Sequence, residues 1–191
     1  FSTTQTYILE LGNQYIRFYR DNGQILSSVP SFEISTPYLT AELFDIKFAQ
    51  SADVMYITHP SHETKKLSRT GHTAWTLTTV DFTNGPYLDT NTSTTTITAS
   101  AQTVGTGRTF TASASTFVSS DVDRLIRFRD GYAKVTGFTS ATVVTVEIIK
   151  DTGSATASTD WSLGAFSDTT GYPSCVTFFE QRLVFAATLN N

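Results

Sequence analysis

The sequence predicts an all-β fold for this chain of 191 residues. Thr, Val, Tyr and Phe, which fit a pleated and half-buried surface, recur in short runs along the chain. Turn-forming residues separate many of these runs, and Asp21-Asn22-Gly23 and Asp130-Gly131 are typical of tight β-hairpins. Helical periodicity is almost absent, and the single candidate helical turn lies around Thr40–Phe44 with Thr40 as its N-cap.

The first half of the chain is predicted to consist of short antiparallel strands. Tyr7–Leu26 is expected to form a β-meander, with turns at Gly12-Asn13 and at Asp21–Gly23. His59-Pro60 is expected to end an apolar strand, because proline cannot donate a backbone hydrogen bond to a neighbouring strand. Further strands are predicted at residues 32–34, 47–50, 53–58, 65–69 and 75–80. Strands of this length and spacing suit a propeller blade or a sandwich.

A shift in composition predicts two lobes. Residues 89–116 are rich in Thr, Ser, Ala and Gly, which is typical of a linker or a thin surface hairpin. Apolar strands return at residues 124–128, 132–138 and 141–149. From Trp161 onward the sequence is again rich in Phe-containing strands, as in the first part. We therefore expect a main β lobe formed by residues 1–88 plus 161–191. A small β-barrel of residues 89–160 is inserted into it, since loop-closure entropy grows slowly with loop length.

The C-terminal segment is predicted to be one apolar strand from Val176 to Phe185. Alternation then places Glu180 and Arg182 on one face, opposite Phe179 and Leu183. We expect Arg182 to hold a carboxylate or backbone carbonyls at the edge of a blade, as a structural group.

Composition limits the classes of function. A net charge of −4 and a pI near 5.3 argue against a protein that grips the phosphates of nucleic acid. No apolar run reaches the length that spans a bilayer, so no membrane partner is expected. The lone Cys175 has no partner for an internal disulfide. Residue 1 is Phe, Met55 is the only methionine, and residues 184–191 have the pattern of a strand entering a turn, so we expect a fragment of a longer protein.

The three histidines, His59, His62 and His72, are the first candidates for a metal or catalytic site. The separation of His59 and His62 occurs in metal sites, but no neighbouring Cys or cluster of carboxylates completes a tetrahedral set. The sequence favours turn histidines beside Pro60 and Gly71.

The remaining candidates for chemistry have structural explanations. Cys175 opens an apolar strand, where a buried cysteine behaves as a small hydrophobic residue rather than a nucleophile. Asp121 and Asp123 could bind a cation, but Arg124 and Leu125 interrupt the pattern of a calcium loop. Gly105-Thr106-Gly107 lacks the third glycine and the helix of a phosphate-binding loop.

A basic and aromatic face is a further candidate, for binding single-stranded nucleic acid. Arg124, Arg127 and Arg129, together with Phe128 and Tyr132, supply the residue types that such a face needs. Alternation along a strand points Phe128 away from Arg127 and Arg129, so a solvated face is favoured. The sequence thus predicts no catalytic, cofactor-binding or metal-binding residues, no cofactor and no enzymatic activity.

Several strings resemble the nozzle proteins of short-tailed bacteriophages, also called tail tubular protein B or packaged-DNA stabilisation proteins. The strings are Asp53-Val-Met-Tyr-Ile-Thr-His-Pro-Ser61, Lys66-Leu-Ser-Arg69, Trp75-Thr-Leu77 and, the strongest, Gly171-Tyr-Pro-Ser-Cys-Val-Thr-Phe-Phe-Glu-Gln-Arg-Leu-Val-Phe-Ala186. The segment Tyr7–Gln50 is also similar to the region just upstream in that family. The family usually has Gly where this chain has Ala187. The resemblance is weakest between residues 90 and 160.

The resemblance implies a structural component of a phage or prophage virion. In the full-length protein, copies would form a ring, a hexamer, at the tail tip. That ring would join the portal adaptor and other tail proteins and would pass double-stranded DNA without binding it tightly. The implied location is the virion tail, after synthesis in the cytoplasm of the bacterial host. An acidic conduit agrees with this role, because it avoids tight binding to phosphates.

Two other classes of function stay open. A carbohydrate-binding or adhesin-like β module would present exposed aromatic platforms made from Tyr15, Tyr19, Trp75 or Trp161. An enzyme would need a deep pocket that joins Cys175 or Asp121 to a histidine.

Overall fold

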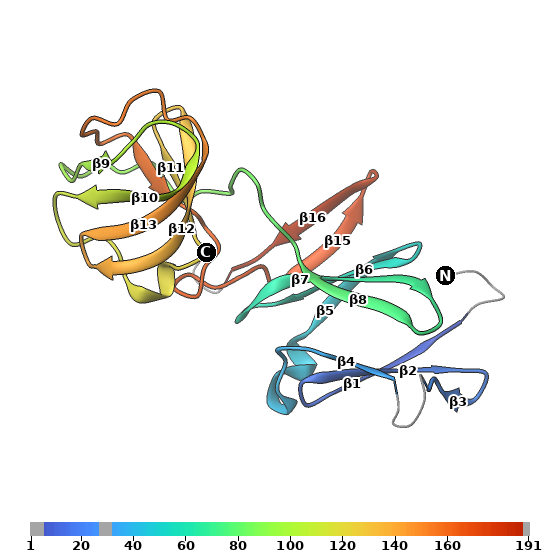
Figure 1. Ribbon diagram of the computed structural model, residues 1–191. Helices are drawn as coiled ribbons and strands as arrows, with labels where there is room; N and C mark the ends of the chain where they lie inside the picture. Colours follow the sequence, from blue (N-terminus) through green and yellow to red (C-terminus); the bar gives the residue numbers. More distant parts are fainter. Residues whose placement is uncertain (1–5, 27–31, 189–191) are drawn as a thin grey trace. The chain divides into compact units, whose positions relative to one another are not determined.

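The computed structural model describes residues 6–26 and 32–188, and within them the fold is all-β with two short 3-10 helices (Figure 1). The chain divides into two compact units. Among the described residues, unit 1 contains 6–26, 32–81 and 172–188, and unit 2 is Phe82–Gly171. Unit 2 is therefore inserted in sequence between the two segments of unit 1.

The boundaries of the units differ from the expected positions at residues 88/89 and 160/161. Strand β14 (Trp161–Leu163), which was expected to lie in the main lobe, pairs with β11 (Leu125–Phe128) of unit 2. Trp161 also packs in the hydrophobic core of unit 2. The change in composition at Trp161 marks the closing strand of the inserted unit rather than the return of the main lobe.

The first sheet of unit 1 confirms the predicted meander, but its first turn is formed by Asn13 and Gln14 rather than by Gly12 and Asn13. Its strands are β1 (Ile8–Gly12), β2 (Tyr15–Arg20), β3 (Gly23–Gln24) and β4 (Glu33–Ser35). They are ordered β1-β2-β3, and β4 also pairs with β2. The turn residues Asp21 and Asn22 have φ of 52° and 62°, which short polar side chains tolerate and which match the twist of a hairpin.

The second sheet of unit 1 is a four-stranded antiparallel meander. Its strands are β5 (Lys47–Ser51), β6 (Val54–His59), β7 (His62–Gly71) and β8 (Ala74–Thr79), in the order β5-β6-β7-β8. The 3-10 helix η1 (Thr40–Asp45) precedes β5. The predicted helical turn is confirmed, but the N-cap is Leu39 rather than Thr40.

Aromatic residues dominate the core of unit 1. Trp75 stacks on Phe18 with ring centroids 4.2 Å apart and meets Tyr7 edge to face. The buried members are Tyr7, Ile16, Phe18, Tyr38, Ile57, Leu67 and Trp75. These residues come from both sheets, so the core joins the two meanders into one unit.

The C-terminal segment of unit 1 is a hairpin, so the prediction of a single strand was wrong. Strands β15 (Cys175–Phe179) and β16 (Arg182–Ala186) pair with each other, and Glu180 and Gln181 form the two-residue turn. Both turn residues have positive φ, 45° and 62°, although neither is Gly, Asn or Asp. Nothing in the residue types signals such a turn.

Two consequences follow for side chains of this hairpin. Arg182 is exposed, and within residues 6–26 and 32–188 no ion pair to it is seen, contrary to the expected role at a blade edge. Cys175 is also exposed rather than buried. The expected turn at the end of the chain, Leu189–Asn191, lies outside the described residues.

Unit 2 is built on one curled six-stranded antiparallel sheet (Figure 1). Its strand order is β14-β11-β12-β13-β10-β9, with β9 at Ile97–Ala99, β10 at Gly105–Ala112, β12 at Gly131–Ser140 and β13 at Val143–Lys150. The second 3-10 helix, η2, spans Ser119–Asp121. Much of the Thr- and Ser-rich stretch, expected to be a linker or a surface hairpin, supplies two strands of this sheet. Ile97, Ala99, Phe110 and Ala112 of this stretch are buried in the core of unit 2.

The predicted hairpin at Asp130-Gly131 is confirmed, with a shift of its turn by one residue. Phe128 pairs with Gly131, so Arg129 and Asp130 form the turn. Gly131 therefore lies outside the turn, and glycine is required there by close packing instead, because a Cβ would lie 2.3 Å from the Lys150 carbonyl oxygen.

Candidate functional site

The turn between β6 and β7 brings His59 and His62 together. β6 ends at His59, β7 begins at His62, and the two residues are register partners across the turn. Pro60 and Ser61 form the connection, as expected from the strand-ending proline. The imidazole rings lie with their centroids 4.9 Å apart.

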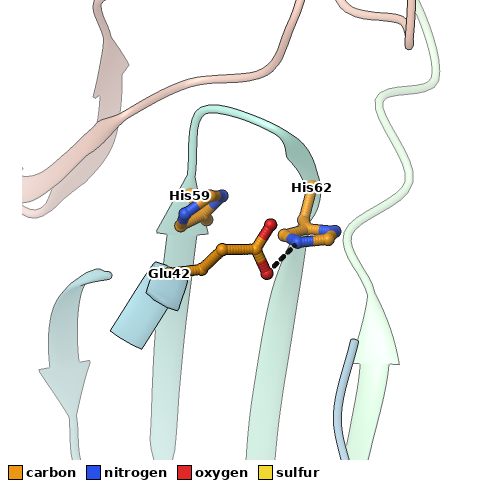
Figure 2. A group of neighbouring side chains, drawn as sticks. All are labelled: Glu42, His59 and His62. Carbon is orange, nitrogen blue, oxygen red and sulfur yellow. Dashed lines mark hydrogen bonds and ion pairs between the residues drawn. The ribbon is translucent and has the colours of Figure 1, made fainter. Parts of the chain in front are cut away.

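Glu42 reaches this pair from η1. Its Oε2 accepts hydrogen bonds from the backbone N–H of Leu39 at 2.7 Å and from Nε2 of His62 at 2.9 Å. Figure 2 shows the carboxylate lying between the two imidazole rings. One ligand atom from each of Glu42, His59 and His62 lies within 4.8 Å of the others. The three side chains form what we call the His–Glu cluster.

His59 is the buried member of the His–Glu cluster. Only 2% of its surface is exposed, whereas the side chains of His62 and Glu42 are about a quarter exposed, at 22% and 24%. The Nδ1 atom of His59 accepts a hydrogen bond from the backbone N–H of Ser61 at 3.1 Å. Its Nε2 is buried and has no hydrogen-bond partner among the described residues.

The electrostatics of the cluster favour a neutral His59 and an ionised Glu42. Burial lowers the pKa of His59, and the neighbouring His62 lowers it further, against the weaker opposing effect of Glu42 and Asp45. The hydrogen bond from Leu39 lowers the pKa of Glu42, and the bond from His62 acts in the same direction. The cluster thus combines an anionic oxygen donor with a neutral imidazole at neutral pH.

The ring of Tyr38 closes one side of the cluster. Tyr38 is fully buried and meets His62 edge to face, with ring centroids 5.4 Å apart, and its ring lies 6.0 Å from that of His59. Burial also raises the pKa of the Tyr38 hydroxyl, so this group stays protonated. The cluster is therefore backed by an apolar wall.

Glu42 is the site residue that sequence reasoning missed. It lies far from the histidines in sequence, on a different element that precedes β5. The signal available in the sequence was the helical turn at Thr40–Phe44, but a helical turn does not indicate which strand end it will face.

Asp121 and Asp123 have separate structural roles. Asp121 forms a buried ion pair with Arg124 at 2.7 Å, and both side chains are at most 3% exposed. Its oxygens also accept hydrogen bonds from the backbone N–H of Val118 and the hydroxyl of Thr169, while Arg124 Nε donates to the Gly164 carbonyl. This network satisfies a charged pair in the interior of unit 2.

The other carboxylate lies at the surface. Asp123 pairs with Lys134 at 3.0 Å, with both side chains partly exposed. The two aspartates therefore do not converge on one cation.

The basic residues of the proposed nucleic-acid face are also engaged. Arg127 pairs with Asp160 at 2.8 Å and donates to the hydroxyl of Ser162. Arg129 donates to the carbonyl oxygens of Thr156 and Ala157. The ring of Phe128 is fully buried, as expected from its direction away from Arg127, but the guanidinium of Arg129 lies over this ring at 5.7 Å from its centroid, contrary to the prediction.

The other predicted candidates are dispersed. Cys175 opens β15, and Gly105 and Gly107 lie within β10, whose register with β13 shifts between Gly105 and Arg108. His72 lies in the β7–β8 turn and contacts Tyr7 and Arg20. The four aromatic residues considered as a glycan platform are buried or half-buried, namely Trp75, Trp161, Tyr15 and Tyr19. The two tyrosines donate hydrogen bonds to Glu10.

A scan against known protein families finds no match for this chain, and a search of curated proteins finds no relative. Within residues 6–26 and 32–188, none of the helices has the length and apolar character needed to cross a membrane.

Proposed function

We propose that this chain is a structural part of a phage tail nozzle protein and has no catalytic role. The observation that carries the proposal is the string from Tyr172 to Ala186, which resembles the strongest block of that family and forms the β15–β16 hairpin. In the full-length protein, copies would form a ring, most simply a hexamer. That ring would bind the portal adaptor and pass double-stranded DNA.

The backbone at the end of this block supports the proposal. Ala187 stands where the nozzle family usually has Gly, and its φ is 57°, in the left-handed region that favours Gly. Its carbonyl oxygen accepts hydrogen bonds from the backbone N–H and the hydroxyl of Ser174. A glycine is therefore the residue that this backbone conformation prefers, which agrees with the family pattern.

The charge distribution is compatible with a conduit that does not retain DNA. Tight binding to phosphates requires Lys and Arg side chains that are free to replace counterions. Arg127, Arg129 and Lys134 are each held by protein oxygens, and the chain carries a net charge of −4.

The direct test is to express the complete gene product that contains this sequence and to image it by electron microscopy. A closed ring of copies that binds the portal adaptor, which neighbouring portal and adaptor genes would identify, is the expected result. A monomeric product with no affinity for the adaptor would refute the proposal.

Two binding assays separate the proposed function from its rivals. The complete protein and this chain should both show no salt-sensitive affinity for duplex DNA at physiological ionic strength. Specific capture of a sugar on a glycan array would instead support a carbohydrate-binding or adhesin-like module.

A further inference from the structure

We infer that Glu42, His59 and His62 form a binding site for a divalent transition-metal ion, with Zn²⁺ as the ion that fits best. Two imidazoles and one carboxylate are a known zinc donor set, and they leave one coordination position for water. A site with two imidazole ligands is expected to bind Mg²⁺ and Ca²⁺ weakly, because these ions prefer oxygen ligands. This site is independent of the proposed function.

The buried nitrogen of His59 is the observation that points to a ligand. A pair formed by Glu42 and His62 alone is explained as a half-buried hydrogen bond at 2.9 Å. It does not explain why His59, only 2% exposed, faces the same carboxylate with an Nε2 that has no partner among the described residues. A buried polar group without a partner is costly, and a bound ion would satisfy it.

The ligand atoms of the His–Glu cluster need to move only slightly closer together to bind an ion. Metal–ligand bonds of about 2.0–2.2 Å at tetrahedral angles place the ligand atoms about 3.3–3.6 Å apart. The ligand atoms of the cluster already lie within 4.8 Å of one another. Rotation of the partly exposed Glu42 and His62 side chains can supply the difference, since neither is locked in the core.

Glu42 is prepared for this role by its second hydrogen bond. Both hydrogen bonds described for Glu42 go to Oε2, so Oε1 is available as the ligand atom while the Leu39 N–H keeps the carboxylate in place. A donor that holds a ligating carboxylate is typical of metal sites.

Binding also has a defined proton balance. On coordination through Nε2, a neutral His62 moves its ring proton from Nε2 to Nδ1 and so gives up its hydrogen bond to Oε2 of Glu42, while Oε1 of Glu42 serves as the ligand atom. On coordination through Nε2, His59 moves its ring proton to Nδ1 and gives up the bond from Ser61 N–H. Ser61 is exposed, so water can take over that N–H. Binding is therefore expected to weaken as the pH falls, because protons compete with the ion for the imidazole nitrogens.

The first test is a titration of the 191-residue chain, without an affinity tag, with ZnCl₂, followed by NMR of the histidine ring nitrogens. Cys175→Ser removes the exposed thiol as a competing ligand. The chain has three histidines, so His72 serves as an internal control. Saturation at one Zn²⁺ per chain with shifts at His59 and His62 but not at His72 is expected. The absence of binding, or equal shifts at all three rings, would overturn the inference.

The second test compares variants in the same Cys175→Ser background. Glu42→Gln and His62→Gln should each weaken Zn²⁺ binding at least tenfold, because losing even an outer partner costs about 10–100-fold. Glu63→Gln, a neighbouring carboxylate that pairs with Lys65, is the matched control and should bind as before. Both altered side chains are partly exposed, so the variants are expected to fold, and circular dichroism checks this.

The third measurement links the ion to folding. Zn²⁺ should raise the Tm of the chain, Mg²⁺ should not, and Glu42→Gln should abolish the rise. An unchanged affinity and an unchanged Tm response in both Glu42→Gln and His62→Gln would show that the ion binds elsewhere.

Discussion

Unit 2 surrounds its core with one curled sheet, whereas unit 1 exposes more of its large apolar side chains, eight among the described residues against five in unit 2. In unit 2 a single curled sheet surrounds thirteen buried core residues, and the ion pair of Asp121 and Arg124 is buried with its hydrogen bonds satisfied. In unit 1 the seven buried core residues lie between two meanders. Four of the five exposed phenylalanines among the described residues belong to unit 1, namely Phe44, Phe48, Phe178 and Phe179.

This difference indicates two ways of using a β-sheet. A sheet that curls on itself buries one face completely and needs no further partner. In unit 1 the two meanders share one core and the β15–β16 hairpin packs against Tyr56 of β6. Exposed aromatic residues on the remaining surface are typical of surfaces that contact other proteins. Under the proposed function, unit 1 would supply the ring contacts and unit 2 would be a self-contained insert.

The strongest test of this comparison separates the two units. Residues 82–171 expressed alone should unfold in one cooperative transition, because their core is complete. The reciprocal variant joins Asp81 to Tyr172 by a short Gly-Ser linker. The linker can be short because both ends lie near the β6–β7 turn: the backbone N–H of Val80 donates to the Thr64 carbonyl, and that of Tyr172 donates to the Pro60 carbonyl. It should fold but bind a hydrophobic dye more strongly than residues 82–171. Urea unfolding measures the cooperativity of each chain, and dye fluorescence measures its exposed apolar surface. Unfolding of residues 82–171 without a cooperative transition would contradict the comparison.

Asp121→Asn should be the most damaging point change in unit 2. It leaves Arg124 buried without its counter-ion, which costs about 3–5 kcal/mol of unfolding free energy. Asp123→Asn is the matched control, because its pair with Lys134 is exposed and such pairs contribute about 0–1 kcal/mol. Urea denaturation of both variants decides the point, and equal effects would show that the buried pair is not special.

Gly131→Ala should destabilise unit 2 by roughly 1–3 kcal/mol, because the added methyl group would overpack against backbone atoms. The nearest are the carbonyl oxygens of Lys150 at 2.3 Å and Asp151 at 2.5 Å. Gly137→Ala, in the same strand, meets Thr145 only at an ordinary 3.6 Å and should be neutral or slightly stabilising. Thermal unfolding of the two variants checks this, and a harmless Gly131→Ala would contradict the close approach.

Ala187→Gly should stabilise unit 1 by about 1 kcal/mol, because it relieves the left-handed conformation of a residue with a Cβ. Ala186→Gly, one residue earlier within β16, should instead destabilise the unit by about 0.5–1 kcal/mol, as glycine does inside a strand. Opposite signs in urea unfolding are expected, and a loss of stability in both variants would count against the described turn.

The stability of unit 1 should be more sensitive to mild acid than that of unit 2. The pKa of His59 is lowered in the folded chain, so its contribution is complete above the unfolded value near 6.5 and is lost as the pH falls below it. The lowered pKa of Glu42 acts in the same direction at lower pH. All three histidines belong to unit 1. Thermal melts followed by NMR between pH 7.5 and 5.5 should therefore shift for unit 1 amides only, and an equal shift in unit 2 would contradict this.

Local patterns predicted most strand positions correctly. Alternation of apolar residues and Asx-Gly turns predicted the first meander, most strands of the β5–β8 sheet and, one residue away from its observed position, the turn at Arg129-Asp130, since these signals depend on neighbouring residues. The same reasoning failed at Glu180-Gln181, where a strongly apolar run contains a turn without its usual residue types. There the pairing of Val176 with Phe185 and of Phe178 with Leu183 outweighs the local preference for an extended backbone.

The amino-acid sequence by itself determined the all-β class, the end of a strand at His59-Pro60 and the insertion of a second unit between two segments of the first. Only the tertiary structure decided that Glu42 meets His59 and His62, that Asp121 is buried against Arg124, and that Trp161 closes unit 2. The physical reason is that strand and turn preferences depend on residues close together in sequence. Contacts between distant elements depend instead on how the sheets pack and which faces they bury.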